Sequence, residues 1–230
     1  MDIRVLKYFL MTAAEKAMNE LVQTEENLAG TISVGCSEMH SMKEFAQIMD
    51  EFQKKNPQVK FELYSSDNQD IKERIEQGQL DLGLLLEPVN ILNYNFVRMN
   101  TKEQWGIFIH EESKLACKKA IHPGDLVGTK VVTVHINTPI HNELVIWSGN
   151  YAKDMAFSTT YNVLYNAVIV AREKKSAVVG MKLDCHYDNM KFIPFEPKLE
   201  LSSVLAWKEH QTKSKTTTAF INFIKEKYKK

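Results

Sequence analysis

Residues 52–88 read FQKKNPQVKFELYSSDNQDIKERIEQGQLDLGLLLEP, and this stretch decides the fold. Asn56 and Pro57 end a helix, and residues 59–64 then alternate apolar and polar side chains, as a half-buried strand does. A polar turn opens a second helix, whose apolar side chains recur at helical spacing at Ile71, Ile75 and Leu80. The uninterrupted apolar run at residues 82–86 predicts a strand covered on both faces. This order of elements predicts a mostly parallel sheet with right-handed crossovers.

The same rhythm extends upstream of this stretch. Residues 1–29 carry apolar side chains at helical spacing and predict one N-terminal helix, which Gly30 ends. TISVG at residues 31–35 predicts a short strand, and a loop follows at residues 36–41. The next helix presents one apolar face, formed by Phe45, Ile48, Met49 and Phe52.

The second half of the chain repeats the pattern more weakly. Short apolar runs predict strands at residues 105–109, 130–134, 155–158, 177–181 and 204–207. Helical periodicity predicts helices at residues 142–151, 161–173 and 220–228. The first and last of these strands stand where a chain would cross between two lobes. The predicted fold class is therefore α/β, with two Rossmann-like lobes and a cleft between them.

Charge and composition exclude several classes of protein. Lys plus Arg and Asp plus Glu both number 29 and are mixed along the chain, so nothing in the charge distribution demands nucleic acid. The apolar runs are too short to span a bilayer and the N-terminus does not read as a secretory signal, so we expect a cytoplasmic protein. Cys36, Cys117 and Cys185 are odd in number and far apart, which predicts reduced thiols.

The sequence carries no signature of catalysis, cofactor or metal. It has no G-x-S-x-G elbow, no P-loop and no G-x-G-x-x-G motif. His135 and His141, like the adjacent Cys185 and His186, lack the paired spacing of a structural zinc site. We therefore predict neither an enzyme nor a bound cofactor or metal.

Five pieces of sequence follow one another in the order found in one protein family. They are GTISVG (30–35), the stretch at 52–88, WGIFIHEESKLA (105–116), DLVG (125–128) and LSSVLAWKEHQTKSKTTTAFINFIK (201–225). Together they resemble the effector domain of LysR-type transcriptional regulators, from Gly30 to the end of the chain. The resemblance implies two lobes of the periplasmic-binding-protein type (type 2), preceded by the N-terminal helix at residues 1–29. It places effector-binding lobe I at residues 30–108 and 206–230 and lobe II at residues 109–205.

Two stretches depart from the family's pattern. MDIRVLKYFL at residues 1–10 resembles the opening of the winged helix-turn-helix domain, and residues 11–29 resemble the far end of the linker helix. Most of the DNA-binding head is thus expected to be missing. Natural deletion and laboratory truncation both stay open, and the retained opening favours deletion. EKKSA at residues 173–177 replaces the glycine-rich turn that usually precedes a late strand.

The resemblance also implies an effector site between the lobes, and hydroxyl-rich turns do follow four of the predicted strands. Because helix N-termini offer unpaired N–H groups and a positive dipole end, we expect an anionic metabolite, a carboxylate or oxyanion. The predicted contacts are Ser37, Met39, His40, Ser66, Asn68, Thr138, Pro139 and Thr160. Met39 replaces a residue that is often small or hydroxylic, which predicts a less polar pocket or a different effector. For any one of these turn residues, helix capping alone explains its presence equally well.

A dimer is the last implication of the resemblance. The first helix of lobe I is expected to pair antiparallel with a lobe II helix of a partner, either a second copy or a full-length homologue. The predicted interface residues are Phe45, Ile48, Met49, Phe52, Tyr161, Leu164, Tyr165 and Val168. The same stripes fit helices packed against their own core. Without a recognition helix, this chain is not expected to bind DNA itself.

Two other functions fit an α/β protein with two lobes. A free-standing solute-binding protein of a transporter is the main alternative, and a signal peptide or lipoprotein cysteine would mark it; neither is seen. An enzyme on the same fold would need a catalytic carboxylate in the cleft, for which Asp67 is the nearest candidate.

Overall fold

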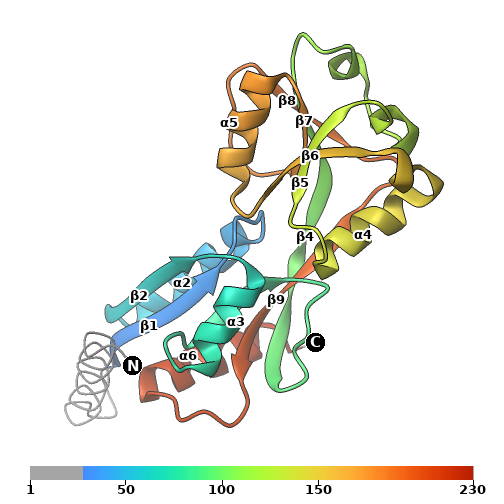
Figure 1. Cartoon of the computed structure of the whole chain (residues 1–230). Coiled ribbons are helices and arrows are strands. Elements are labelled where there is room, and N and C mark those ends of the chain that lie inside the picture. The colour runs from blue at the N-terminus through green and yellow to red at the C-terminus, as the bar shows by residue number, and fades with distance from the viewer. Residues whose placement is uncertain (1–27, 230) are drawn as a thin grey trace, which may run out of the picture.

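The computed structural model describes residues 28–229, which form two α/β lobes joined by long strands (Figure 1). The first lobe starts with strands and helices in alternation. These are β1 (Ala29–Cys36), α2 (Met42–Lys55), β2 (Gln58–Ser65), α3 (Asn68–Glu76) and β3 (Leu82–Leu86). The terminal helix α6 (Lys215–Lys227) packs back onto this lobe against β1 and α2.

The middle of the chain forms the second lobe. It enters along β4 (Tyr94–His110) and leaves along β9 (Glu200–Lys208). Between them lie β5 (Lys130–Val134), α4 (Pro139–Ser148), β6 (Ala156–Tyr161), α5 (Leu164–Lys174), β7 (Ala177–Met181) and β8 (Met190–Pro194). Three short 3-10 helices complete it: η1 (Lys114–Cys117), η2 (Pro123–Leu126) and η3 (Gly149–Asp154). Within residues 28–229, no helix is long and apolar enough to cross a membrane.

The strands follow the order β2-β1-β3-β9-β4-β7-β5-β6, with β8 beside β4. β1 pairs in parallel with β2 and β3, and β5 pairs in parallel with β6 and β7, so the parallel core predicted for each lobe is confirmed. β4 pairs with β9 up to Gln104, and with β7 and β8 from Trp105 and Gly106 onward. We propose this change of partner as the lobe boundary, with lobe I at 29–104 and 200–229 and lobe II at 105–199. The predicted boundaries, after residues 108 and 205, lie four and six residues further along.

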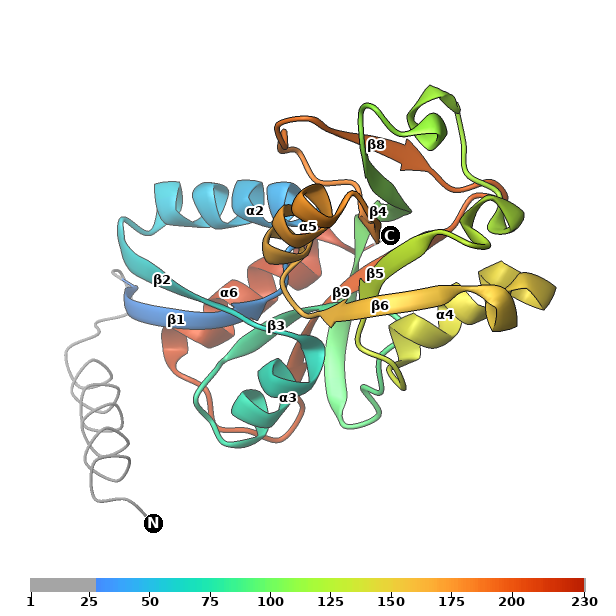
Figure 2. The same cartoon turned by 45° about the horizontal axis from the view of Figure 1, so that its top comes forward.

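Helices cover both faces of each lobe (Figure 2). In lobe I, α2 and α6 share one face, where Phe220 packs against Phe52 and Phe61 with ring centroids 5.0 Å and 4.9 Å apart. α3 covers the other face with Ile71 and Ile75. In lobe II, successive side chains of β5 point to opposite faces, so that one packs in the cluster of α4 and the next in that of α5. The helical stripes predicted from the sequence are thus buried faces.

Several predicted bounds need correction. β3, β5 and β7 match their predicted ranges, whereas β8 and the first half of β4 were not predicted. α4 begins at Pro139 rather than at residue 142, because Thr138 caps it. β6 continues to Tyr161 rather than ending at residue 158. The predicted helix at residues 1–29 lies outside the described residues except at its end, where Ala29 belongs to β1 rather than to a helix.

The unusual turn EKKSA after α5 leaves the fold intact. Lys175 stands at the C-cap of α5 with a left-handed backbone (φ 49°), the conformation that glycine adopts most readily. β7 follows directly at Ala177. Replacement of a glycine-rich turn therefore places strain on one lysine and does not alter the course of the chain.

Phe220 is the first test of this architecture. Phe220→Ala removes a fully buried ring that joins α6 to α2 and β2, and we expect a loss of about 3–5 kcal/mol in the free energy of unfolding. Leu92→Ala is the matched control, because that side chain is 89% exposed and its loss should stay within about 0.5 kcal/mol. Urea unfolding of both variants measures the difference. Equal stability of the two variants would contradict the assigned core.

Candidate functional site

The loops that follow the parallel strands of the two lobes meet at a cavity of about 600 Å³. Lobe I lines it with residues between Cys36 and Lys43, and with Leu63 and Ser65 at the end of β2. Lobe II lines it with Tyr165 in the first turn of α5 and with residues 183–187 after β7. Figure 2 shows α5 beside the N-terminal end of α2. The cavity therefore lies in the cleft between the lobes.

The N-terminus of α2 is capped by a carboxylate from a distant strand. Ser41 occupies the N-cap position, but its side chain makes no capping hydrogen bond. Instead, the fully buried Glu103 of β4 accepts hydrogen bonds from the backbone N–H of His40 (2.8 Å) and of Ser41 (2.9 Å). A carboxylate here satisfies two donors at the positive end of the helix. Since Glu103 immediately precedes the point where β4 changes partner, the start of α2 is tied to the crossing between lobes.

The N-terminus of α5 is met by a carboxylate from the other lobe. Val163 stands at its N-cap and offers no side-chain acceptor. Glu38, in the loop before α2, accepts a hydrogen bond from the backbone N–H of Leu164 through its Oε2 at 2.6 Å. This bond joins residues 126 positions apart and closes one side of the cleft.

Asp184 makes the other polar contacts across the cleft. Its Oδ1 lies 3.3 Å from Nδ1 of His40, and its Oδ2 lies 3.6 Å from Nζ of Lys43. All three side chains line the cavity. Because Asp184 and Lys43 are largely exposed, the ion pair between them contributes on the order of 0–1 kcal/mol.

The remaining cavity wall is apolar and aromatic. Tyr165 is 55% exposed and its ring centroid lies 6.2 Å from that of Tyr187, which in turn packs edge-on against Phe108. Met39 and Leu183 add aliphatic surface. Burial raises the pKa of the Cys36 thiol, while a hydrogen bond with Ser65 lowers it to a smaller extent. The less polar pocket predicted from Met39 agrees with this lining.

The structure brings together only part of the predicted effector site. Ser37, Met39 and His40 line the cavity. The other predicted residues lie outside its lining, and most have local structural roles: these are Ser66, Asn68, Thr138, Pro139 and Thr160. Asn68 exchanges two hydrogen bonds with the backbone of Leu86, and the hydroxyl of Thr138 accepts from the backbone N–H of His141. Thr160 is an exposed residue within β6, paired with Thr133. At Asn68, Thr138 and Thr160 the structure thus shows contacts within a single lobe, and a role of these residues in effector binding stays a prediction.

Sequence reasoning missed Glu38, Glu103 and Asp184. Each acts through a partner far away in the chain, and nothing in the local pattern announces such a pairing. One signal was available at α5, since Val163 is a poor N-cap and a helix without its own cap needs another acceptor for its first N–H groups.

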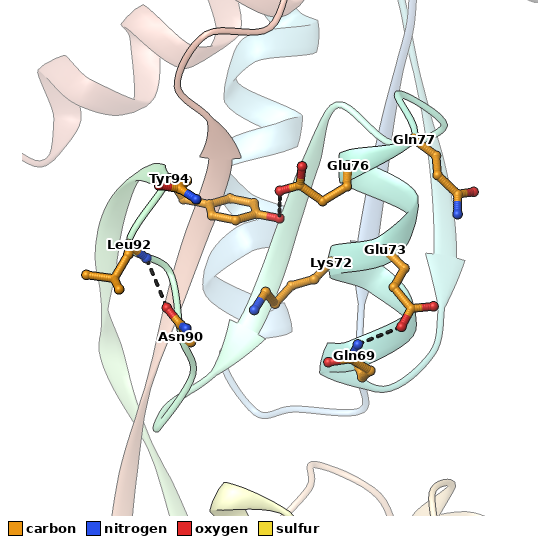
Figure 3. Close-up of a pocket in the computed structure, with 9 residues that line it drawn as sticks. Gln69, Lys72, Glu73, Glu76, Gln77, Asn90, Leu92 and Tyr94 are labelled. Atoms are coloured by element: carbon orange, nitrogen blue, oxygen red, sulfur yellow. Dashed lines mark hydrogen bonds between the residues drawn. The ribbon is translucent and has the colours of Figure 1, made fainter.

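A second cavity of about 330 Å³ lies on lobe I between α3 and the loop before β4 (Figure 3). Several of its polar side chains form hydrogen bonds or ion pairs with each other or with Lys208. The hydroxyl of Tyr94 donates to Oε1 of Glu76 at 2.8 Å, Lys208 contacts the other oxygen of Glu76, and Gln69 donates to Glu73 at 2.6 Å. Lobe I alone lines this pocket, whereas both lobes line the larger cavity, so we place the candidate site in the cleft.

The predicted dimer-interface residues are mostly buried within the chain itself. Phe45, Ile48 and Phe52 of α2 pack in the lobe I core, and Leu164 and Val168 of α5 pack in the lobe II core. The hydroxyl of Tyr161 donates to the carbonyl of Val179. Of the set, Tyr165 is exposed, and Met49 and Tyr161 are half-buried. An interface on these helices must therefore use their outer faces, because a side chain buried in its own lobe cannot contact a partner.

Among residues 28–229, no three His, Cys, Asp or Glu side chains gather in a group that could hold a metal ion. The predicted absence of a bound metal stays a prediction.

One family model and one curated relative each match more than half of this chain. The family model described as LysR substrate binding domain matches residues 25–162. The HTH-type transcriptional regulator YtlI of Bacillus subtilis is 25% identical over 164 residues, which are 68% of this chain and 52% of that protein. The chain thus spans about half the length of this curated relative.

Solved structures share the fold at lower sequence identity. The effector-binding domain of QuiR in complex with shikimate has a TM-score of 0.74 at 16% identity, covering 87% of this chain and 98% of that one. Full-length CbnR complexed with its target DNA has a TM-score of 0.75 at 8% identity, covering 97% and 78%. A LysR-family regulator from Pseudomonas aeruginosa has a TM-score of 0.68 at 16% identity, covering 97% and 80%. The predicted two-lobed fold of the periplasmic-binding-protein type is confirmed.

Glu103 provides a test of how the cleft is built. Glu103→Gln keeps the size of the side chain but turns an NH₂ group toward one of two buried N–H donors. We expect a loss of about 1.5–3 kcal/mol in the free energy of unfolding, the usual contribution of a hydrogen bond to a charged group. Glu62→Gln on the exposed side of β2 is the control and should change stability by less than about 0.5 kcal/mol. If Glu103→Gln is as stable as its control in urea unfolding, the capping role is wrong.

Proposed function

The chain belongs to the LysR substrate-binding domain family, and from that premise we propose that it senses a small molecule bound in the cavity between its two lobes. The family is one of transcriptional regulators and not of enzymes. The observation that supports the proposal most directly is the cavity itself, about 600 Å³ in volume and lined by both lobes. A pocket of this size suits a small metabolite. No catalytic step is proposed.

Binding and signalling are coupled through the contacts that cross the cleft. Glu38 reaches α5, and Asp184 reaches His40 and Lys43, so a ligand in the cavity adjoins every one of these contacts. A ligand that binds one arrangement of the lobes more tightly shifts the population toward that arrangement. Movement of lobe II about β4 and β9 would then change the geometry of an assembly containing this domain, and through it the position of a DNA-binding head. DNA contacts are assigned to that head rather than to residues 28–229.

The helix N-termini at the cleft do not support the anionic effector that the sequence predicted. The anionic metabolite was predicted from free helix N-termini, but the N-termini of α2 and α5 already hold Glu103 and Glu38. At these two helices the physical reason for an anion is removed. A carboxylate or oxyanion effector stays a prediction that a binding screen decides.

We keep a dimer as part of the proposal, formed with a second copy or with a homologue. The half-buried Met49 of α2, the exposed Tyr165 of α5 and the exposed Leu63 of the edge strand β2 offer apolar surface for it. Tyr165 and Leu63 also line the cavity, so the proposed interface adjoins the ligand site.

A ligand screen tests the sensing role. A metabolite library, including carboxylates and oxyanions, is expected to contain a compound that raises the melting temperature; at 100 times its Kd the added stability is about 2.7 kcal/mol. Ser37→Trp, which fills the cavity, should abolish the shift, whereas Gln69→Trp in the second pocket should preserve it. A library without any stabiliser, or stabilisers that act equally on Ser37→Trp, would count against the proposal.

Analytical ultracentrifugation tests the dimer. We expect the chain to sediment as a dimer at tens of micromolar, and Tyr165→Asp to weaken association by about tenfold or more, since a charge replaces exposed apolar surface at the interface. Ile146→Asp, which changes a 72% exposed side chain on α4, is the matched control and should not alter association. A strict monomer, or equal effects of the two substitutions, contradicts this arrangement.

A further inference from the structure

We infer that the cavity selects a ligand with an ammonium group on an apolar body, and that Glu38 is the residue that binds this group. The inference rests on the proposed sensing function of the same cavity and names the class of effector.

The charge of the cavity lining favours a cation. Glu38 and Asp184 carry two negative charges and Lys43 one positive charge, so the lining is net negative when its histidines are neutral. Glu103 adds a buried negative charge directly behind His40 and Ser41. An incoming carboxylate therefore meets repulsion, whereas a cation is attracted.

The carboxylate of Glu38 has a hydrogen-bond donor but no positively charged partner among the described residues. Its Oε2 accepts the N–H of Leu164, and within residues 28–229 no lysine, arginine or histidine forms an ion pair with it. Lys43, the lysine of the lining, contacts Asp184 instead. The negative charge of Glu38 acts on two nearby tyrosines. Burial is the main cause that raises the pKa of Tyr161 and of Tyr187, and the charge of Glu38 raises both pKa values further. Among the described residues, Glu38 is thus a carboxylate without a counter-ion in a largely apolar cavity.

Aromatic and aliphatic side chains form the rest of the cavity wall. Tyr165 and Tyr187 place two aromatic rings 6.2 Å apart at the cavity, and aromatic faces attract ammonium groups. Met39, Met42 and Leu63 offer aliphatic surface for the rest of a ligand. A carboxylate, aromatic rings and apolar side chains together match an organic ammonium ion better than an oxyanion.

Four probes with one carbon skeleton separate the ligand classes. They are 3-methylbutylamine, leucine, 3-methylbutan-1-ol and 4-methylpentanoate, each titrated calorimetrically into the full chain. We expect the amine to bind at least tenfold more tightly than the alcohol, leucine to bind more weakly than the amine because its carboxylate meets the negative lining, and 4-methylpentanoate to bind most weakly. Tenfold is the discrimination that one hydrogen bond to a charged group provides.

Glu38→Gln then tests the assigned residue. The amide keeps an acceptor oxygen for the N–H of Leu164 and removes the charge, so affinity for the amine should fall about tenfold or more while affinity for the alcohol stays unchanged. Glu62→Gln, on β2 outside the cavity lining, is the matched control and should bind like the parent chain. Unchanged amine affinity in Glu38→Gln overturns the inference.

The outcomes also separate this inference from the sensing function. If 4-methylpentanoate binds best and Ser37→Trp blocks it, the ammonium class is wrong and the sensing role stands. If none of the four probes binds, the ammonium inference fails, and the metabolite library with its Ser37→Trp control decides the sensing role independently.

Discussion

The hydrogen bonds that Glu103 accepts from His40 and Ser41, directly before α2, hold the two lobes' shared strand and the wall of the cleft together. Glu103 lies on β4, one residue before the point at which that strand changes partner from β9 to lobe II. Its buried carboxylate fixes the start of α2 at the crossing. An unpaired carboxylate at this depth would be very costly, so the crossing strand and the helix must keep their relative position. The loop from Ser37 to His40, which carries Glu38 toward lobe II, is positioned as a consequence.

How far the sequence predicts the structure depends on the range of the interactions involved. β3, β5 and β7 were predicted within their observed bounds because continuous apolar runs report burial on both faces directly. The helices were found from their apolar stripes for the same reason. β8 and the first half of β4 were not predicted because apolar and polar residue types do not alternate along their sequences. Their pairing with distant strands, including β9, holds them in the sheet.

The site was less predictable than the fold for a related reason. Ser, Thr, Asn and Asp after a strand satisfy the next helix locally, as Asp67 does for α3 and Thr138 does for α4. Their presence therefore says little about a ligand. The helices that face the cavity are the ones that lack such a local cap, and distant glutamates serve them instead. In this chain a poor N-cap marks the functional cleft better than a hydroxyl-rich turn does.

Under the proposed sensing role, this arrangement would let even a weakly bound ligand change the relation between the lobes. Besides the shared strands, the polar contacts across the cavity are one charged hydrogen bond, from Leu164 to Glu38, and the exposed pairs of Asp184. Such contacts amount to a few kcal/mol at most. An equilibrium held by so small a difference responds to a ligand whose affinities for the two arrangements differ by a similar amount. Because Glu38 contacts lobe II and lines the cavity, any ligand that binds its carboxylate changes the strength of the contact that holds the lobes together, and recognition and conformational response become one event.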